Sequence, residues 1–320
     1  GGRPHAEPEA LRRAGEAARG ATLYVTLEPC SHFGRSPPCV DTVIASGVSR
    51  VVSAIEDPNP EVAGQGHAKL RTAGIAVDVG LCAAEAAYDH AGHFRRIRDG
   101  RPHVILKLAV SADDRIGAAG RKPVAITGEA ARTKVHLLRA HCDAIMVGIG
   151  TVLADAPVLT CRLPGMEARS PVRVVLDRAL RIPGTSRLVH SARATPLWVM
   201  ASETAEAAAA ARLGAAGAEV IHVAADLAKP GLDPSAVLHA LGEKGISRLM
   251  VEGGARVAAS LVGAGLVDEI WLLRGPDAVG ADGVPALDAM PLAAITQSPA
   301  FKVRASEILG KDTLTVYERA

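Results

Sequence analysis

TLEPCSHFGRSPPC, residues 26–39, is the stretch that decides the fold of the amino-terminal part of this chain, together with HAE at residues 5–7. It contains Cys30 and Cys39, each directly after a proline, and His5 lies before them in the chain. An imidazole and two thiolates are ligands that zinc binds in proteins, and a set of three leaves the fourth tetrahedral position open for water. The pattern therefore predicts a catalytic zinc site formed by His5, Cys30 and Cys39.

Glu7 follows the predicted ligand His5 by two residues, which places a carboxylate beside the metal. Zinc-dependent nucleobase deaminases use such a glutamate for proton transfer, with the signature H-x-E followed by P-C-x-x-C. Zinc-bound water ionises near neutral pH, and a neighbouring carboxylate then carries the proton onward. The first half of the signature matches, whereas the spacing from Cys30 to Cys39 is longer. We predict that Glu7 transfers protons in a hydrolytic deamination.

A purely structural zinc is the main alternative for this motif. Structural sites usually have four protein ligands, and the sequence has neither a C-x-x-C pair nor a second histidine cluster. His32, between the cysteines, is a fourth ligand, a substrate contact or a solvated loop residue, and we favour the last two. Because prolines precede Cys30 and Cys39, we expect both thiols at turn-to-helix junctions, where backbone N–H groups favour thiolate.

The composition indicates a two-domain enzyme that acts on a small molecule. At 320 residues the chain exceeds the usual length of one domain. Its apolar content of 48% supports two cores, but the aromatic content of 2% leaves few stacking platforms for single-stranded nucleic acid. The net charge is +2, without a run of Lys and Arg. We therefore expect no nucleic-acid partner.

The cysteine count and the hydropathy pattern bear on location. Five cysteines without regular spacing are typical of a reducing compartment. No apolar stretch reaches the roughly 20 residues of a membrane span, and no signal peptide opens the chain. We expect a cytoplasmic protein without membrane contact. Because the chain begins at Gly1, close to the predicted ligand His5, we also expect it to be a fragment.

Strands alternate with helices along the whole chain, which predicts an α/β fold with a largely parallel sheet. In the first part we expect strands over 21–27, 50–55 and 75–79, and helices over 9–18, 40–46, 69–72 and 83–98. Gly and Pro adjoin at residues 99–102, where the pattern restarts, so we place a domain boundary there.

The second part continues the alternation to the end of the chain. We expect strands over 104–110, 144–147, 172–176, 197–201, 219–223, 248–252 and 269–273, and helices over 129–141, 204–213, 234–243 and 256–262. Residues 301–305 and 313–317 are predicted to pair as an antiparallel hairpin across Gly310.

Two glycine turns follow strands in the second part, at Gly148–Gly150 and at Gly253–Gly254. A turn from a strand into a helix exposes backbone N–H groups that favour an anionic phosphate. Neither turn matches G-x-G-x-x-G, because Leu153 occupies the last glycine position of the first. Most such turns only reverse the chain, so spacing alone does not assign a nucleotide.

The sequence resembles the family of bifunctional riboflavin-biosynthesis deaminase/reductases. The phrase at 26–39 is similar to the deaminase half. The reductase half is matched by LKLA (106–109), ITG (126–128), VHLLRA (135–140), GIGTVLAD (148–155), LTCR (159–162), VVLD (174–177) and EGG (252–254). The resemblance implies a cytidine-deaminase-like α/β/α domain over 1–99, without its N-terminal helix and hairpin, and a dihydrofolate-reductase-like α/β domain over 102–320.

The resemblance also implies which residues meet NADPH and the substrate. Residues expected at the cofactor are Ala109, Ala125, Thr151, Asp155, Gly254, Ala255, Arg256, Val257, Ala258, Ala259 and Ser260. Residues expected at the substrate are Arg139, Leu159, Arg162 and Glu252. A phosphorylated ribose favours fixed guanidinium donors, which Arg139 and Arg162 provide; the alternative for each is a surface salt bridge.

Lys107 lies in an otherwise apolar strand. It either polarises the sugar carbon or its hydroxyl during reduction, as a catalytic residue, or is an edge-strand lysine, and the sequence leaves both open. Three residues depart from the family pattern, namely Asp114 in place of Gly, Ala125 in place of Trp and Ala156 in place of Asp. We expect Ala125 to remove one stacking surface at the cofactor.

The resemblance implies a two-step enzyme of riboflavin synthesis that uses Zn²⁺ and NADPH. The first step deaminates 2,5-diamino-6-ribosylamino-4(3H)-pyrimidinone 5′-phosphate, and the second reduces the ribosyl group to ribityl, giving 5-amino-6-(5-phosphoribitylamino)uracil. We expect a complete reductase half, a truncated deaminase half, and a homo-oligomer formed through the reductase domain.

Two other functions fit parts of the sequence. A non-enzymatic zinc- and nucleotide-binding module needs neither Glu7 nor Lys107, so their presence argues against it. A tRNA or nucleoside deaminase with an unrelated C-terminal domain is disfavoured by the low aromatic content and the dispersed basic charge.

Overall fold

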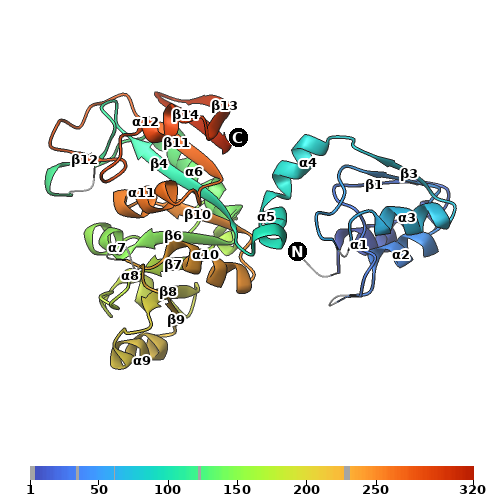
Figure 1. The fold of residues 1–320 in the computed structure, drawn as a ribbon, viewed down its shortest axis with the longest axis horizontal. Coiled ribbons are helices and arrows are strands. Elements are labelled where there is room, and N and C mark those ends of the chain that lie inside the picture. The colour runs from blue at the N-terminus through green and yellow to red at the C-terminus, as the bar shows by residue number, and fades with distance from the viewer. Residues whose placement is uncertain (1–3, 34–35, 61, 122–123, 227–230) are drawn as a thin grey trace. The chain divides into compact units, whose positions relative to one another are not determined.

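The computed structural model describes residues 4–33, 36–60, 62–121, 124–226 and 231–320. Gly1, where we expected a fragment to begin, and Gly34 and Arg35 of the inter-cysteine loop lie outside these residues. The chain divides into two compact units, Gly1–Asp99 and Gly100–Ala320 (Figure 1). Among the described residues, no helix combines the length and the apolar character needed to cross a bilayer.

The first unit is a small α/β layer. Its parallel sheet has the order β1 (Thr22–Val25), β2 (Arg50–Ser53), β3 (Ala76–Val79). Its helices are α1 (Ala6–Ala14), the short 3-10 helix η1 (Gly15–Ala18), α2 (Cys39–Ala45), α3 (Gln65–Thr72), α4 (Ala83–Asp89) and α5 (Ala91–Asp99). The core is made of aliphatic side chains from α1, α2, α3 and β2, with Val51 and Leu70 fully buried. This core anchors the start of α2, where Cys39 lies.

The prediction of a single helix over 83–98 is wrong, because α4 ends at Asp89 and α5 begins at Ala91. His90 caps α4, and its Nε2 lies 3.0 Å from the Thr26 hydroxyl oxygen. A tertiary contact to the segment after β1 therefore interrupts a stretch whose local propensity favours one continuous helix.

The second unit contains a nine-stranded sheet with the order β13-β14-β11-β4-β10-β6-β7-β8-β9 among the described residues. Its strands are β4 (His103–Val110), β6 (Ala144–Gly148), β7 (Val172–Leu176), β8 (Leu197–Ser202), β9 (Glu219–Val223), β10 (Arg248–Glu252), β11 (Glu269–Arg274), β13 (Phe301–Leu309) and β14 (Asp312–Arg319). The pairs from β11 through β9 are parallel, whereas β14 pairs antiparallel with both β11 and β13. The predicted α/β fold with a largely parallel sheet is confirmed.

Helices cover both faces of this sheet (Figure 1). They are α6 (Glu129–Ala140), α7 (Ile149–Asp155), α8 (Arg187–His190), α9 (Ala207–Ala216), α10 (Pro234–Glu243), α11 (Ala255–Gly263) and α12 (Ala293–Thr296). Short elements are the 3-10 helices η2 (Ala119–Arg121) and η3 (Glu167–Arg169), and the strands β5 (Arg115–Gly117) and β12 (Val284–Pro285), which pair with each other. We did not predict α7, α8, α12, β5 or β12, since each is shorter than the periodic pattern that reveals an element.

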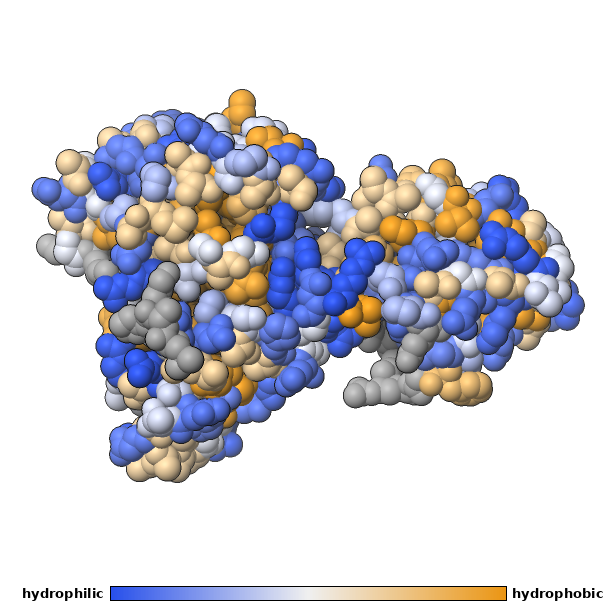
Figure 2. Space-filling model, in the orientation of Figure 1, coloured by the Kyte–Doolittle hydropathy of each residue, from blue (hydrophilic) through white to orange (hydrophobic). Residues whose placement is uncertain are grey.

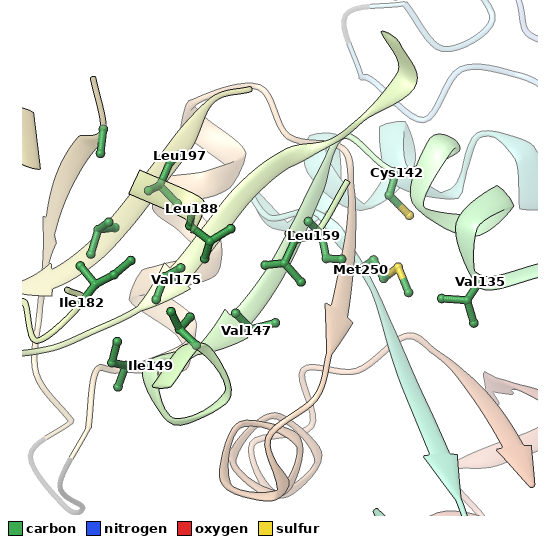
Figure 3. Close-up of a cluster of buried hydrophobic side chains, with 14 of the residues drawn as sticks. Val135, Cys142, Val147, Ile149, Leu159, Val175, Ile182, Leu188, Leu197 and Met250 are labelled. Atoms are coloured by element: carbon green, nitrogen blue, oxygen red, sulfur yellow. The ribbon is translucent and has the colours of Figure 1, made fainter. Parts of the chain in front are cut away.

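Alternate residues of the central strands point to opposite faces of the sheet. Ile145 and Val147 of β6 belong to a core that α6, α7, α8 and α9 cover, and Figure 3 shows this cluster. Ala144 and Met146 belong to a second core under α10 and α11. This period of two places aliphatic side chains on both faces, which is typical of a parallel sheet covered by helices on both sides.

A buried ion pair stabilises the start of β4. Arg101 donates from Nη1 and Nη2 to the two carboxylate oxygens of Asp268, at 2.7 and 2.9 Å. Asp268 also accepts from the Val104 backbone N–H at 2.9 Å. Burial raises the pKa of Asp268, but hydrogen bonds and charge from Arg101 outweigh burial, and the pKa is lowered.

Replacing Asp268 by Asn should destabilise the second unit by about 3–5 kcal/mol, because the buried Arg101 loses its counter-charge. The matched control is Asp114→Asn, which breaks an exposed pair with Arg274 and should cost about 0–1 kcal/mol. Trp198 and Trp271 are the two tryptophans of the chain and both lie in this unit, so urea unfolding followed by tryptophan fluorescence reports on it alone.

The same pair predicts a pH dependence. Because the folded-state pKa of Asp268 is lowered, its stabilisation is present above the unfolded-state pKa of about 3.9 and is lost as the pH falls toward the folded-state value. The difference in unfolding free energy between the wild type and Asp268→Asn should therefore shrink in acid. Equal stability of the two proteins at neutral pH would contradict the assignment.

Candidate active sites

The predicted zinc ligands come together in the first unit. His5 is the N-cap residue of α1, Cys39 is the first residue of α2, and Cys30 lies in the loop after β1. The Nδ1 atom of His5 is 3.2 Å from the Cys39 sulfur and 3.7 Å from the Cys30 sulfur. All three ligand atoms lie within 4.8 Å of one another.

These separations fit a zinc ion. With Zn–N distances of about 2.0 Å and Zn–S distances of about 2.3 Å, tetrahedral geometry requires N···S separations of about 3.5 Å. The observed values lie on either side of that figure. His32 is exposed and does not belong to the ligand cluster found among the described residues, so the cluster has three members. Three protein ligands are typical of a catalytic rather than a structural site.

The expectation that both thiols lie at turn-to-helix junctions is confirmed for Cys39 and wrong for Cys30, which lies in irregular structure. The junction nevertheless acts on Cys30, because the Cys39 backbone N–H donates to the Cys30 sulfur at 3.3 Å. Hydrogen bonds from the Cys39 thiol, the Cys39 backbone N–H and His5 lower the pKa of Cys30 to about 5. A thiolate is the form in which cysteine binds metal.

Glu7 lies beside the ligands. The pKa of the Cys39 thiol is raised, chiefly by its hydrogen bond with Cys30 and by burial, and further by the charge of Glu7 and a hydrogen bond with it. The predicted proton-transfer residue is thus in contact with a ligand and is not itself a member of the ligand cluster. This is the arrangement that the H-x-E signature predicts.

Glu28 holds the cysteine loop in place, a role that sequence reasoning missed. Its carboxylate is buried and accepts backbone N–H groups of four residues, Asp57, Gly64, Gly66 and His67. A Cβ atom on Gly66 would lie 2.2 Å from the Pro29 carbonyl oxygen, so only glycine allows this approach. A carboxylate inside an apolar run, directly before Pro29, was the available signal.

The second unit contains a cavity of about 890 Å³ at the carboxyl ends of β4, β6, β7 and β10. Its wall includes the predicted residues Lys107, Ala109, Ala125, Arg139, Thr151, Asp155, Leu159, Arg162, Glu252, Gly254, Ala255, Arg256, Val257 and Ser260. Ala258 and Ala259 were also predicted at the cofactor but do not line the cavity. They face the core under α11, where Ala258 is fully buried.

Glu252 lies between two cations in this cavity. Its Oε1 atom is 3.4 Å from Lys107 Nζ, and its Oε2 atom accepts from Arg139 Nε and Nη2 at 2.9 and 2.6 Å. Burial raises the pKa of Glu252, but Lys107 and Arg139 outweigh burial, so the pKa is lowered. Lys107 is not an edge-strand lysine, because β4 is a central strand of the sheet. Arg139 does not form a surface salt bridge, because it pairs with Glu252 inside the cavity.

The turn from β10 into α11 suits a dinucleotide. Gly253 and Gly254 have φ of 96° and 85°, and a Cβ atom on Gly254 would lie 3.4 Å from Thr151 Oγ1. Within the described part of the chain no side chain caps the N-terminus of α11, so its first backbone N–H groups are available to bind a diphosphate. The cavity, the narrow turn and the uncapped helix together fit NADPH.

The backbone of the segment after α7 is strained. Ala156 and Leu159 have φ of 42° and 59°, in the left-handed region that residues other than glycine rarely adopt. Leu159 is nevertheless buried and lines the cavity. Burial raises the pKa of Asp155 in the same wall. Such strain is concentrated at functional sites in proteins.

Asp113 and Asp114 shape the loop after β4. Asp113 accepts from the Ser111 hydroxyl and from the backbone N–H groups of Val279 and Gly280, which together lower its pKa. Asp114, which replaces a family glycine, has a φ of 63° and pairs with Arg274 at 2.6 Å. Aspartate tolerates the left-handed region better than most residues, which explains how the replacement fits.

Sequence reasoning missed four basic residues of the cavity wall, Arg132, His136, Arg178 and Arg181. His136 lies on the same helical face as Arg139, one turn earlier, so helical spacing was the available signal. Arg178 and Arg181 follow β7, whose end is level with that of β6 in the register Gly148↔Leu176.

Comparison with known protein families assigns both units. The description "RibD C-terminal domain" matches residues 102–315, and "Cytidine and deoxycytidylate deaminase zinc-binding region" matches residues 2–55. The riboflavin biosynthesis protein RibD of Aquifex aeolicus is 38% identical over 318 residues, covering 99% of this chain and 86% of the relative. RibD of Escherichia coli is 38% identical, covering 97% and 85%.

Solved structures agree. Acinetobacter baumannii RibD superposes with a TM-score of 0.84 at 34% identity, covering 99% of this chain and 86% of that one. A deaminase/reductase from Thermotoga maritima superposes with a TM-score of 0.83 at 34% identity, covering 100% and 86%. The Saccharomyces riboflavin biosynthesis reductase Rib7 superposes with a TM-score of 0.53 at 22% identity, covering 70% of this chain and 92% of that one, and shares the fold of the second unit. The predicted fold class is confirmed.

Replacing Cys30 or Cys39 by Ser should abolish stoichiometric zinc, because each removes a thiolate from a three-ligand set. Glu7→Gln should retain zinc and lower the rate of ammonia release by about 10²–10⁴-fold, the usual worth of a positioned acid–base group. Elemental analysis and an ammonia assay measure the two effects.

Cys82→Ser is the matched control, since Cys82 is exposed and outside the ligand cluster. It should change neither zinc content nor rate. Full zinc content in Cys30→Ser and Cys39→Ser would refute the ligand assignment.

Proposed function

The chain belongs to the RibD family of riboflavin-biosynthesis enzymes, and we propose that its two units divide that family's two reactions between them. The protein is a bifunctional deaminase and reductase that uses zinc and NADPH. It deaminates 2,5-diamino-6-ribosylamino-4(3H)-pyrimidinone 5′-phosphate and reduces the ribosyl group to ribityl. The proposal assigns deamination to residues 1–99 and reduction to residues 102–320.

In the deaminase unit, His5, Cys30 and Cys39 hold the metal, which supplies an activated water when bound. Glu7, in contact with Cys39, accepts a proton and delivers it to the departing amine. Glu28 keeps the Cys30 loop in register by accepting backbone N–H groups, so the two thiols stay at ligand distance without substrate. His32 is exposed and lies between Cys30 and Cys39 in the chain, and it is a substrate contact in this proposal.

In the reductase unit, NADPH supplies the hydride when bound. Gly254 and the first turn of α11, whose N-terminus has no side-chain cap among the described residues, would hold its diphosphate through backbone N–H groups. Lys107 Nζ, held by ionised Glu252, donates a hydrogen bond to the sugar oxygen and stabilises the charge that forms there. The pairing of Lys107 with Glu252 across β4 and β10 is the observation that carries this assignment.

The proposal also includes the class of substrate and the location of the protein. On the face that Figure 2 shows, hydrophilic and hydrophobic residues are interspersed on both units. A small phosphorylated pyrimidine is the partner in this proposal, which the similarity to RibD proteins supports. The cysteines Cys30, Cys39, Cys82, Cys142 and Cys161 are free, in agreement with the cytoplasm as the proposed location.

Lys107→Met should lower kcat for NADPH oxidation by about 10²–10³-fold with 5-amino-6-(5-phosphoribosylamino)uracil as substrate, because one preorganised donor to the reacting oxygen is lost. Affinity for NADPH should stay within a few-fold. Stopped-flow absorbance at saturating substrate measures the first and fluorescence titration the second.

Lys134→Met is the matched control, because Lys134 forms an exposed pair with Glu307 on the surface of α6. It should oxidise NADPH at the wild-type rate. A wild-type protein that oxidises no NADPH would refute the reductase assignment, and an unimpaired Lys107→Met would refute the role of Lys107 alone.

The edge strand β13 supports the proposal of a homo-oligomer formed through the reductase unit. It is the outermost strand of the nine-stranded sheet, and its side chains from Lys302 to Ile308 are exposed. Val303 and Ile308 are 60% and 79% exposed. An exposed strand edge with apolar side chains is a template for pairing with a second copy of the chain.

Ile308→Lys should shift the protein toward monomer, because a charge on the pairing strand opposes edge-to-edge association. Leu153→Lys is the matched control, since Leu153 is an exposed apolar residue of α7. Sedimentation equilibrium measures both. A monomeric wild type, or a variant Ile308→Lys as associated as the wild type, would contradict an interface at β13.

A further inference from the structure

One face of α6 presents three polar side chains to the cavity of the second unit. Arg132, His136 and Arg139 all line it and follow one another at spacings of four and three residues. Side chains at these spacings lie on the same face of a helix. Arg162, from the segment after Leu159, lines the same part of the wall, and its backbone N–H contacts His136.

Arg139 has few donors left for the substrate. Its Nε and Nη2 atoms donate to Glu252 Oε2, and its Nη1 atom donates to the Thr160 carbonyl at 3.0 Å. The expectation that Arg139 provides fixed guanidinium donors to the ribose phosphate therefore conflicts with its pairing to Glu252. A phosphate in this part of the cavity needs further donors.

The protonation pattern of His136 follows from one hydrogen bond. The Arg162 backbone N–H donates to His136 Nδ1 at 3.3 Å. A backbone N–H can only donate, so Nδ1 is the acceptor and the neutral ring carries its hydrogen on Nε2. The imidazole lines the cavity, and Nε2–H is its remaining donor.

The charge state of the ring agrees with that tautomer. Burial, then the charges of Arg139 and Arg162, lower the pKa of His136. Glu252 and the Thr160 carbonyl act in the opposite direction but are outweighed. The ring is therefore neutral at neutral pH, as an acceptor at Nδ1 requires.

We infer that His136 binds the 5′-phosphate of the substrate by donating Nε2–H, with the Arg162 guanidinium as the neighbouring cation. This rests on the proposed reductase function. The Nδ1 atom of His136 accepts from the Arg162 backbone N–H and so positions Arg162. The Nε2–H group of the same ring donates to the phosphate. The competing role is purely structural. In that role His136 only supports the segment around Cys161, whose thiol donates to the His136 backbone carbonyl at 3.4 Å.

Two substitutions separate binding from support. Asn at position 136 places an amide oxygen near the location of Nδ1, so His136→Asn keeps the acceptor for Arg162 and removes the distal donor. His136→Gln places an amide nitrogen near the location of Nε2 and keeps that donor. The control is His141→Asn, at the exposed end of the same helix and outside the cavity wall.

Ribose 5-phosphate is the binding probe, titrated calorimetrically into each protein. His136→Asn should weaken its binding about tenfold, as expected for one hydrogen bond to a charged group, whereas His136→Gln and His141→Asn should stay within about threefold of wild type. The KM for 5-amino-6-(5-phosphoribosylamino)uracil should rise in parallel with kcat unchanged, because the phosphate is held equally in ground and transition states.

The dephosphorylated substrate supplies a second comparison. Its kcat/KM should be equal in wild type and His136→Asn, since the lost donor faces only the phosphate. A purely structural role predicts the reverse pattern, with His136→Asn like wild type and His136→Gln impaired, and would overturn the inference. Unchanged binding in both variants would overturn it as well. If the wild type oxidises no NADPH, the proposed reduction fails, while the calorimetric comparison still decides the role of His136.

Discussion

The parallel register of the central sheet is the constraint on which the reductase site depends. Because β4 and β10 run in the same direction, Lys107 and Glu252 are direct neighbours at their carboxyl ends. The same register places Gly148 beside the end of β7 and the glycine turn of β10 beside α7. Ligands of open parallel sheets bind at this edge. The polar groups of the cavity thus gather at one edge because the strands are parallel, not because they are close in sequence.

The two units compensate the charge of a carboxylate in different ways. In the second unit the half-buried carboxylate of Glu252 is compensated by two cations, Lys107 and Arg139, and Lys107 lines the cavity. In the first unit the buried carboxylate of Glu28 is compensated by backbone N–H groups instead. Glu28 also belongs to a group with Glu56 and His67 whose ligand atoms lie close together, but both of its carboxylate oxygens already accept backbone N–H groups.

Much of the candidate site was predictable because its residues occur in contiguous phrases. HAE at 5–7 and the two Pro-Cys pairs indicated the zinc ligands, and EGG at 252–254 indicated the cofactor turn. The prediction that all residues from 254 to 260 contact the cofactor includes Ala258 and Ala259, which do not line the cavity. A helix has 3.6 residues per turn, so only one of its faces lies along a cavity. His136 and Glu28 escaped prediction because their roles arise from backbone N–H groups distant in sequence, at Arg162 and at Gly64 to His67.

The sequence by itself determined the alternation of strands and helices and the family, and it predicted the ligand set His5, Cys30 and Cys39, because periodicity and short motifs are local properties of a chain. Tertiary structure alone decided that Lys107 is central rather than at an edge, that Arg139 is engaged with Glu252, and that the helix over 83–98 breaks at His90. Each of these depends on which strand or side chain lies beside another at long sequence separation, and strand order and packing are not encoded in any single window of residues.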